Sequence, residues 1–325
     1  MEKVDLSIII PMFNEEEVID ETIKSVTSEL VSLNLNWEII LVNDGSTDNT
    51  LDLCRRASAL DDRVRIVAYS PNRGRGYALR QGFNAAAGDV VISIDADLTY
   101  SPDHISLIWN EMEKKESDIV LGSAYMKGGK VIDVPLKRIL ISRVGNLILG
   151  FSFPGRIKTI TCVLRGYRKE VLDLLELESE KKEIHLEILA KAIALGYRVK
   201  EIPAVLIGRK KGRSKFHFKS TSASHLAFSF YQKPMIVFGF LGIFMVIAGS
   251  ILGIVFIIQR YMGTLNPTRP IFILMILMFL GGIQMISFGF IANQIGIVKK
   301  ELFRVQRISK QISKQLEVKN RYEKR

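Results

Sequence analysis

Two long apolar segments near the end of the chain constrain its architecture more than any other feature. Residues 235–258 and 271–292 are almost wholly apolar and contain no charged side chain. At 1.5 Å per residue, a helix over either segment would exceed the roughly 30 Å thickness of a bilayer's hydrocarbon core. The alternative is a helical hairpin buried in a soluble core, but two uninterrupted runs of this length are typical of membrane spans. The sequence therefore predicts a transmembrane hairpin over residues 235–293.

The charge distribution predicts the orientation of this hairpin. The connector, residues 259–270, is short, so both flanking polar parts are expected on one side of the membrane. Residues 299–325 contain ten Lys or Arg against three Glu, a net +7 of the chain's +11. Positive charge beside a span favours the cytoplasm, and here it outnumbers Arg260 and Arg269 in the connector. We therefore expect an integral protein of the plasma (cytoplasmic) membrane with both termini in the cytoplasm.

The last segment, residues 294–325, is predicted to be a basic amphipathic helix. Its apolar residues recur every three or four positions, at Leu302, Val305, Ile308, Ile312 and Leu316. A basic tail can bind nucleic acid, but its position directly after the apolar segments favours an anionic membrane surface, so no nucleic-acid partner is expected. The apolar stripe fits either lipid headgroups or the same helix of a second copy. We expect a homo-oligomer.

Before the hairpin, short apolar strands alternate with helical patterns. Strands are predicted at residues 4–10, 38–43, 64–68, 90–94, 119–122 and 198–207, with helices between them at 15–33, 76–87, 105–115 and 182–195. This alternation predicts an α/β domain with a doubly wound, mostly parallel sheet. We assign residues 1–216 to this domain and residues 217–234 to a juxtamembrane interfacial segment. Two widely separated cysteines, Cys54 and Cys162, fit packed thiols in a reducing compartment.

The strand at residues 90–94 delivers two carboxylates at its end, Asp95 and Asp97. Strand residues at i and i+2 point to one side, so both carboxylates can face the same volume. In an open α/β sheet, ligands bind at the carboxyl ends of the strands. Two carboxylates that converge there hold a cation, share a proton or repel each other. Mg²⁺ or Mn²⁺ would suit them, because both ions prefer carboxylate and phosphate oxygens. The alternative is a solvated pair of turn aspartates.

Four short motifs follow one another in the first hundred residues. They are Pro11-Met12-Phe13-Asn14-Glu15, Asn43-Asp44-Gly45-Ser46-Thr47-Asp48, Asn72-Arg73-Gly74-Arg75-Gly76 and Asp95-Ala96-Asp97. In this order and spacing they resemble the family 2, GT-A fold glycosyltransferases. Three further features point to one subgroup of this family. They are the Glu201-Ile202-Pro203 motif, the basic loop at residues 209–215 and the C-terminal hairpin. The whole chain is similar to polyprenyl-phosphate hexose synthases, the group of dolichol-phosphate mannose synthase and bacterial polyprenyl-phosphate glucosyltransferases.

The resemblance implies an inverting, metal-dependent hexosyltransferase. It would move one hexose from a nucleoside-diphosphate sugar to a dolichyl or undecaprenyl phosphate at the cytoplasmic face of the membrane. Two alternatives stay open: a membrane-anchored family 2 enzyme with another acceptor, and a catalytically silent membrane scaffold. The processive members carry a Gln-x-x-Arg-Trp signature that this sequence lacks, since Trp37 and Trp109 lie in other contexts.

The resemblance also implies roles for particular residues. Asp95 and Asp97 would be the metal ligands and, with Arg209, the catalytic residues. Contacts to the nucleotide sugar fall on Pro11, Phe13, Glu15, Asp44, Arg75 and Asp95. The glycines at 74 and 76 would let the backbone approach a ligand closely. For Glu15 and Asp44 the structural alternative is ordinary helix and turn capping.

A lipid phosphate needs positive charge beside the membrane. The candidate residues for binding this phosphate are Arg138, Ser142, Arg143, Arg209 and Lys215, of which all but the serine are positively charged. A guanidinium suits bidentate phosphate binding, whereas Arg138 and Arg143 could equally be interfacial side chains that reach toward water. The attacking phosphate is already anionic near neutral pH, its second pKa being about 6, so a strong general base is not required.

Three positions depart from the family pattern. Thr99 stands where the family often has a further metal ligand, Gln. Ala124 replaces a common Arg after Gly122-Ser123. Residues 159–165, Thr-Ile-Thr-Cys-Val-Leu-Arg, replace an Asp-Pro-Thr-Ser-Gly-Phe-Arg stretch and keep only its threonine and arginine. These departures fall at positions that the resemblance links to acceptor binding and donor identity, and they are the reason for keeping the scaffold alternative.

Overall fold

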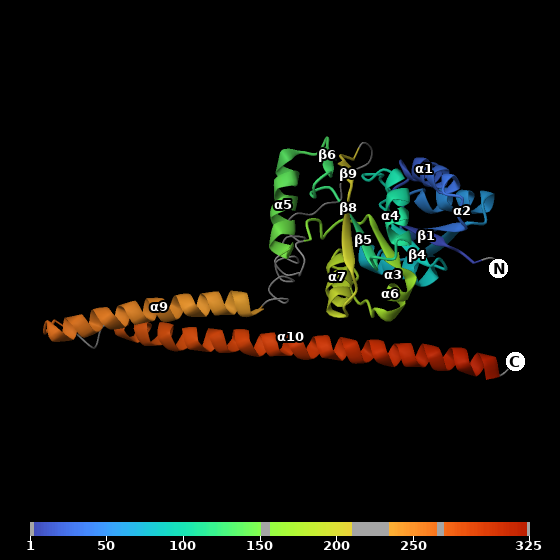
Figure 1. The fold of residues 1–325 in the computed structure, drawn as a ribbon. Coiled ribbons are helices and arrows are strands. Elements are labelled where there is room, and N and C mark those ends of the chain that lie inside the picture. Colours follow the sequence, from blue (N-terminus) through green and yellow to red (C-terminus); the bar gives the residue numbers. More distant parts are fainter. Residues whose placement is uncertain (1–2, 151–156, 210–233, 265–269, 324–325) are drawn as a thin grey trace. The chain divides into compact units, whose positions relative to one another are not determined.

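The computed structural model describes residues 3–150, 157–209, 234–264 and 270–323. The chain divides into two units: residues 1–225 with 303–325, and residues 226–302. Figure 1 shows their elements. Lys215 and nearly all of the expected interfacial segment 217–234 lie outside the described residues.

The first unit is built on a seven-stranded sheet in the order β3-β2-β1-β4-β7-β5-β8. Its strands are β1 (Leu6–Met12), β2 (Trp37–Asp44), β3 (Val64–Tyr69), β4 (Val90–Ser93), β5 (Ile119–Ser123), β7 (Arg165–Arg168) and β8 (Val199–Pro203). All pairs are parallel except those that β7 makes with β4 and β5. The expectation of a mostly parallel α/β sheet is therefore confirmed, with one inserted antiparallel strand.

The helices of this unit lie between the strands in sequence. They are α1 (Ile19–Ser32), α2 (Thr50–Leu60), α3 (Arg75–Ala85), α4 (Asp103–Glu113), α5 (Leu136–Gly150), α6 (Lys169–Leu174) and α7 (Ile184–Ala194). Of these, α2, α3, α4 and α6 contact the sheet directly. Every residue of β1 and β2 is buried. Helix α3 packs closely on them, because Gly82 leaves room for the side chains of Ile9 and Val42.

The predicted strand 198–207 is split in two. Strand β8 belongs to the large sheet, whereas β9 (Val205–Ile207) pairs with β6 (Lys130–Ile132) in a separate parallel sheet. Arg209 lies two residues after the end of β9, so this small sheet determines where the basic loop begins.

The second unit consists of α9 (Pro234–Tyr261) and the first part of α10 (Pro270–Glu323). Both helices are long and apolar enough to be candidate membrane spans. They pack through small residues: a Cβ placed on Gly242 would lie 2.6 Å from the carbonyl oxygen of Gly282. Small residues at helix crossings are typical of membrane helices. Most of their large apolar side chains are exposed, unlike those of a soluble core.

Helix α10 is a single helix of 54 residues. It joins the second apolar segment to the basic tail without a break. The segments predicted separately at residues 271–292 and 294–325 therefore lie in one continuous helix.

Candidate active site at the carboxyl ends of strands β1 and β4

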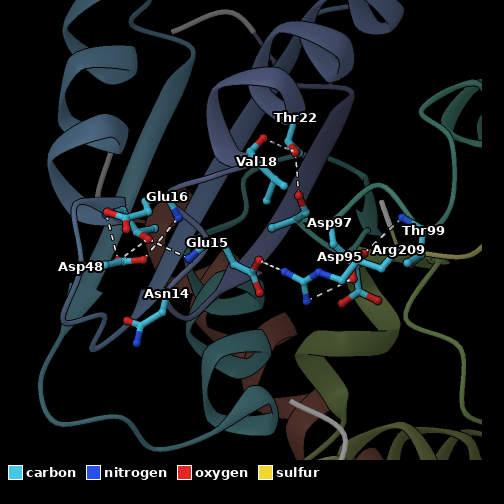
Figure 2. A network of polar contacts seen from close by, with 12 residues as sticks. Asn14, Glu15, Glu16, Val18, Thr22, Asp48, Asp95, Asp97, Thr99 and Arg209 are labelled. Atoms are coloured by element: carbon cyan, nitrogen blue, oxygen red, sulfur yellow. Dashed lines mark hydrogen bonds and ion pairs between the residues drawn. The ribbon is translucent and has the colours of Figure 1, made fainter. Parts of the chain in front are cut away.

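The strand order reverses between β1 and β4, because β2 follows β1 on one side and β4 adjoins it on the other. The crevice outside such a reversal is the usual ligand site of an open α/β sheet. Glu15 follows β1, and Asp95 and Asp97 follow β4. Three carboxylates predicted from separate motifs therefore meet at one point of the sheet edge (Figure 2).

Two arginines neutralise these carboxylates. The Arg209 guanidinium donates a hydrogen bond from Nη2 to Oε2 of Glu15, and its Nη1 lies 3.6 Å from Oδ2 of Asp97. Arg75, the first residue of α3, lies with Nη2 3.1 Å from Oδ1 of Asp95. Figure 2 shows Arg209 between Glu15 and Asp97. The structure thus brings together five of the predicted site residues.

Asp95 has a perturbed acidity. Burial, which disfavours the charged form, raises the pKa of Asp95 to about 6; Arg75 opposes this shift, and the charges of Asp97 and Glu15 add to it. A carboxyl group with such a pKa is half protonated near pH 6. A perturbed carboxyl beside a second one at the carboxyl ends of the sheet strands is a functional-site signature.

The carboxylates fit a divalent metal. Mg²⁺ is usually held by one or two protein carboxylates, with substrate phosphates and water completing the shell. Asp95 and Asp97 supply that donor set, although in the described part of the chain no cluster of three His, Cys, Asp or Glu forms a complete protein cage. At the departure position 99, the backbone N–H of Thr99 donates to Oδ1 of Asp97 at 3.1 Å. This bond orients the carboxylate.

Asp44 holds the neighbouring turn together. Its buried carboxylate accepts hydrogen bonds from Nδ2 of Asn72 and the backbone N–H groups of Arg73 and Gly74, each at 2.8 Å. The next residue is Arg75, so this turn also positions the partner of Asp95. A contact between Asp44 and a nucleotide stays a prediction. Pro11 is buried in β1 beside Val42, and Phe13 follows the strand end half-buried.

The two glycines of the Asn72–Gly76 motif leave room for the backbone of residues 179–181 of the same chain. A Cβ on Gly76 would lie 2.5 Å from the carbonyl oxygens of Ser179 and Lys181, and one on Gly74 would lie 2.7 Å from that of Glu180. The Glu180 carbonyl accepts hydrogen bonds from the N–H groups of Gly76 and Tyr77. The space where a ligand was expected to approach these glycines is therefore filled by residues 179–181.

This packing introduces Lys182, a residue that sequence reasoning missed. Its half-buried ammonium has a lowered pKa because burial disfavours the charge and because Arg75 and Arg138 repel it, while Asp95 attracts it. Lys182 therefore adds positive charge beside the carboxylates. The only sequence signal was the Lys181-Lys182 pair at the start of the helix predicted over residues 182–195, and such a pair is usually solvated.

Three of the predicted acceptor residues, Arg138, Ser142 and Arg143, lie along α5. Arg138 and Arg143 are exposed; Arg138 is a charge neighbour of Lys182, and Arg143 lies over the Tyr125 ring, 5.6 Å from its centroid. Ser142 accepts from Nδ2 of Asn146 through its carbonyl oxygen, at 2.9 Å. Helix α5 also exposes apolar side chains, namely Leu136, Leu140, Ile141 and Val144.

Two of the departures from the family pattern, at positions 159 and 124, are buried in the core. Thr159 is buried; its hydroxyl lies 2.7 Å from that of Ser123, and its N–H donates to Glu201. Arg165 is fully buried, and its guanidinium donates to the backbone carbonyl oxygens of Cys162, His185 and Ile160. Arg165 is thus a structural brace, and Ala124 is a buried small residue.

The known proteins that this chain resembles in sequence are glycosyltransferases. The sequence profile described as "Glycosyl transferase family 2" matches residues 7–175. A dolichol-phosphate mannosyltransferase of Pyrococcus furiosus is 35% identical over 66% of this chain, which spans 60% of that relative's length. An undecaprenyl-phosphate 4-deoxy-4-formamido-L-arabinose transferase of Salmonella choleraesuis is 28% identical over 91% of this chain and 90% of its own.

Among solved structures, glucosyl-3-phosphoglycerate synthase from Mycobacterium tuberculosis, in complex with Mn²⁺, uridine diphosphate and glucosyl-3-phosphoglycerate, superposes with a TM-score of 0.55. It is 19% identical and covers 70% of this chain and 80% of its own. At this identity the likeness concerns the fold.

Proposed function

This chain belongs to glycosyl transferase family 2, and we propose that it transfers one hexose from a nucleoside-diphosphate sugar to a polyprenyl phosphate at the cytoplasmic membrane face. The observation that carries the proposal is the position of Arg209, which lies between Glu15 and Asp97. Arg209 begins the basic loop that precedes the candidate membrane spans, and its guanidinium contacts two of the carboxylates expected to hold the donor. The two similar proteins named above act, by their names, on dolichol phosphate and undecaprenyl phosphate.

Asp95 and Asp97 are proposed to hold Mg²⁺ or Mn²⁺. When bound, the metal would neutralise the diphosphate and stabilise the charge that develops as it leaves. For Asp95 to serve as a ligand it must be ionised, and Arg75 favours that form. Glu15 and Asp44 are proposed to contact the nucleotide, because carboxylate oxygens accept hydrogen bonds from base N–H groups and ribose hydroxyls.

The acceptor phosphate is proposed to enter from the side of α5. Arg138, Arg143, Ser142 and Arg209 would hold it near the anomeric carbon, with Lys215 supplied by the basic loop. Direct attack in a single displacement inverts the anomeric configuration. The exposed apolar side chains of α5 support a place beside lipid.

The domain assignment follows from the same proposal. Residues 1–216 would form the cytoplasmic catalytic domain, 217–234 the interfacial segment, 235–293 the transmembrane hairpin and 294–325 the cytoplasmic tail. The +7 charge of residues 299–325 supports this orientation.

A direct assay tests the function. Purified protein is incubated with polyprenyl phosphate, Mg²⁺ or Mn²⁺ and a panel of radiolabelled sugar nucleotides, and label is sought in the organic extract. Transfer from one donor is expected, and it should be lost in Asp97→Ala. The exposed Asp62→Ala variant is the matched control. Unchanged transfer by Asp97→Ala would refute the metal assignment, and no transfer from any donor would favour a silent scaffold.

A further inference from the structure

His104, in the first turn of α4, is a buried side chain that the proposed chemistry does not use, with only 2% of it exposed. The backbone N–H of Val205, the first residue of β9, donates a hydrogen bond to its Nε2 at 2.9 Å. On the other side of the ring, Nδ1 lies 2.8 Å from the carbonyl oxygen of Ser101 and 3.3 Å from Oδ1 of the exposed Asp103. The ring therefore joins two segments that are 101 residues apart in sequence.

These partners assign the tautomer of the ring. A backbone N–H can only donate a hydrogen bond, so Nε2 of His104 accepts and carries no proton. The proton is on Nδ1, which donates it to the carbonyl oxygen of Ser101. His104 thus accepts at one end and donates at the other, and an apolar side chain in its place would leave buried polar groups of both segments unpaired.

Two further contacts join the same segments. The backbone N–H of Ile207 donates to the carbonyl oxygen of Thr99 at 2.8 Å. Between this pair and the histidine contact, Tyr100 and Leu206 form an antiparallel bridge. Strand β9 is thereby attached along its length to residues 97–101, which we call the Asp97 loop.

The attached segments carry the two sides of the contact between Asp97 and Arg209. In the Asp97 loop, the N–H of Thr99 donates to Oδ1 of Asp97 at 3.1 Å. Beyond β9, Arg209 follows Ile207 by two residues, and its Nη1 lies 3.6 Å from Oδ2 of Asp97 (Figure 2). The separation of the proposed metal ligand from this guanidinium therefore depends on how the Asp97 loop packs against β9.

The Asp97 loop needs support from outside because part of its backbone is strained. Leu98 has a φ of +50°, in the left-handed region that bulky side chains rarely adopt. Such a conformation persists only where the surrounding structure holds it. The bond from His104 to Ser101 is one such restraint, and the ring that makes it is itself bonded to β9.

We propose that His104 is a positioning residue for the proposed transfer: its ring, bonded at both ends, holds the Asp97 loop against β9 and so fixes Asp97 relative to Arg209. His104 touches no reacting atom. Its effect on metal binding and on rate rests on the proposed function, whereas the linkage between the two segments can be measured without it. When the bond to Val205 is lost, the Asp97 loop can leave β9, and the carboxylate of Asp97 loses its fixed orientation.

Two polar variants separate the two ends of the ring. In His104→Gln the side-chain amide extends as far as Nε2, so its oxygen can still accept from the N–H of Val205. In His104→Asn the amide extends only as far as Nδ1, so a donor to Ser101 is kept and the acceptor for Val205 is lost. Ile108→Ala is the matched control, because Ile108 is fully buried on the same helix and packs on Gly166 of β7, away from β9.

Hydrogen exchange in the full-length protein under native conditions tests the linkage. The amides of Val205 and Ile207 should exchange several-fold faster in His104→Asn than in the parent protein, and His104→Gln should restore their protection. In Ile108→Ala both amides should stay close to their parental rates. Equal exchange in His104→Asn and Ile108→Ala would refute the linkage.

Binding of Mn²⁺ in the presence of a nucleoside diphosphate, followed by electron paramagnetic resonance, tests the positioning role without an activity assay. His104→Asn should bind Mn²⁺ about tenfold more weakly than the parent, as is typical when a group that orients a metal ligand is lost. Its kcat for transfer should also fall, and His104→Gln should restore both quantities.

Parental Mn²⁺ affinity and kcat in His104→Asn would overturn the positioning role, whatever its hydrogen exchange, and so would a parent protein that binds no Mn²⁺. If the parent binds Mn²⁺ but transfers no sugar, the proposed function fails, and the Mn²⁺ affinities of the two variants still decide the role of His104.

Discussion

Arg209 donates a hydrogen bond to Glu15 across 194 residues of sequence. The bond joins the end of β9 to the end of β1, and the same guanidinium faces Asp97 at 3.6 Å. A cation from the segment before the candidate membrane spans thus neutralises carboxylates that are expected to receive a metal and a donor. Binding of the metal by Asp97 requires Arg209 to give up part of this contact.

Removing the Arg209 charge should slow transfer. We expect Arg209→Gln to lower kcat by about 10²-fold, the typical effect of losing one preorganised group that stabilises developing charge. The metal concentration for half-maximal rate should fall, because the competing cation is gone. Steady-state kinetics with a metal titration would measure both. Arg63→Gln, which breaks an exposed pair with Asp61, is the control; an unchanged kcat for Arg209→Gln would contradict the catalytic role.

The raised pKa of Asp95 predicts a pH dependence of activity. Below pH 6 the carboxyl is increasingly protonated and cannot bind a cation, so metal-dependent transfer should fall as pH drops through about 6. A pH profile of kcat/KM at a fixed metal concentration below saturation would measure the acidic limb, because saturating metal would displace the proton from Asp95. A rate that stays flat from pH 7 to pH 5 would contradict this assignment.

The same pKa predicts an effect on stability. Because the folded-state pKa lies above the ordinary value, Asp95 stabilises the fold fully below about pH 4, and this contribution is lost as pH rises through 6. At pH 8 without metal, Asp95→Asn should therefore be more stable, by up to about 3 kcal/mol for a shift of roughly two units. Thermal unfolding in chelator would show a higher Tm than the parent at pH 8, with the gain shrinking toward pH 4.

Lys182 should matter for phosphate binding. Its ammonium adds to the charge of Arg75 and Arg138, so Lys182→Gln should weaken binding of a phosphate-bearing substrate by roughly tenfold, as for a charged hydrogen bond of about 1.5–3 kcal/mol. Titrations with a nucleoside diphosphate and with polyprenyl phosphate would identify which phosphate is affected. The adjacent Lys181→Gln is the control, because Lys181 is exposed. If Lys182→Gln bound both ligands with the same affinity as the parent protein, Lys182 would have only a structural role.

Replacing Gly76 with alanine should create a packing defect. In Gly76→Ala the new methyl group would lie 2.5 Å from two backbone carbonyl oxygens, so residues 179–181 must shift. Overpacking of this kind costs about 1–3 kcal/mol. Gly145→Ala is the matched control, because it lies in α5 with nothing within 4 Å, and alanine there should be neutral or stabilising by up to about 1 kcal/mol. Denaturant unfolding of both variants would measure the contrast.

The sequence was most informative where signals are local. The strand that leads to Asp95 and Asp97, and the turn after β2, are each encoded in fewer than ten consecutive residues, so their order predicts the sheet edge where they meet. Asp44 illustrates the limit of that reasoning. Its position at a strand end was predictable, but its three hydrogen bonds to residues 72–74 come from a turn about thirty residues away.

The elements that sequence reasoning missed depend on distant partners. Strand β7 pairs antiparallel between β4 and β5, and its short run, Arg-Gly-Tyr-Arg, has no alternating pattern. Lys182 reaches the site only because Gly74 and Gly76 admit residues 179–181. The sequence changes from apolar to basic at Lys299, and this change suggested an element boundary that α10 does not have. Lys, Glu and Arg are strong helix formers and no proline follows, so the helix continues.

The turn held by Asp44 has a consequence for how such a site can change. Asp44 fixes residues 72–74, residue 75 is the arginine that pairs with Asp95, and Asp95 is the carboxyl whose acidity decides whether it can bind a cation. A substitution at the end of β2 is thus transmitted to the end of β4 through four consecutive residues. In the proposed roles, nucleotide binding at Asp44 and metal binding at Asp95 are therefore mechanically coupled, and we expect a variant selected for one to carry a change in the other.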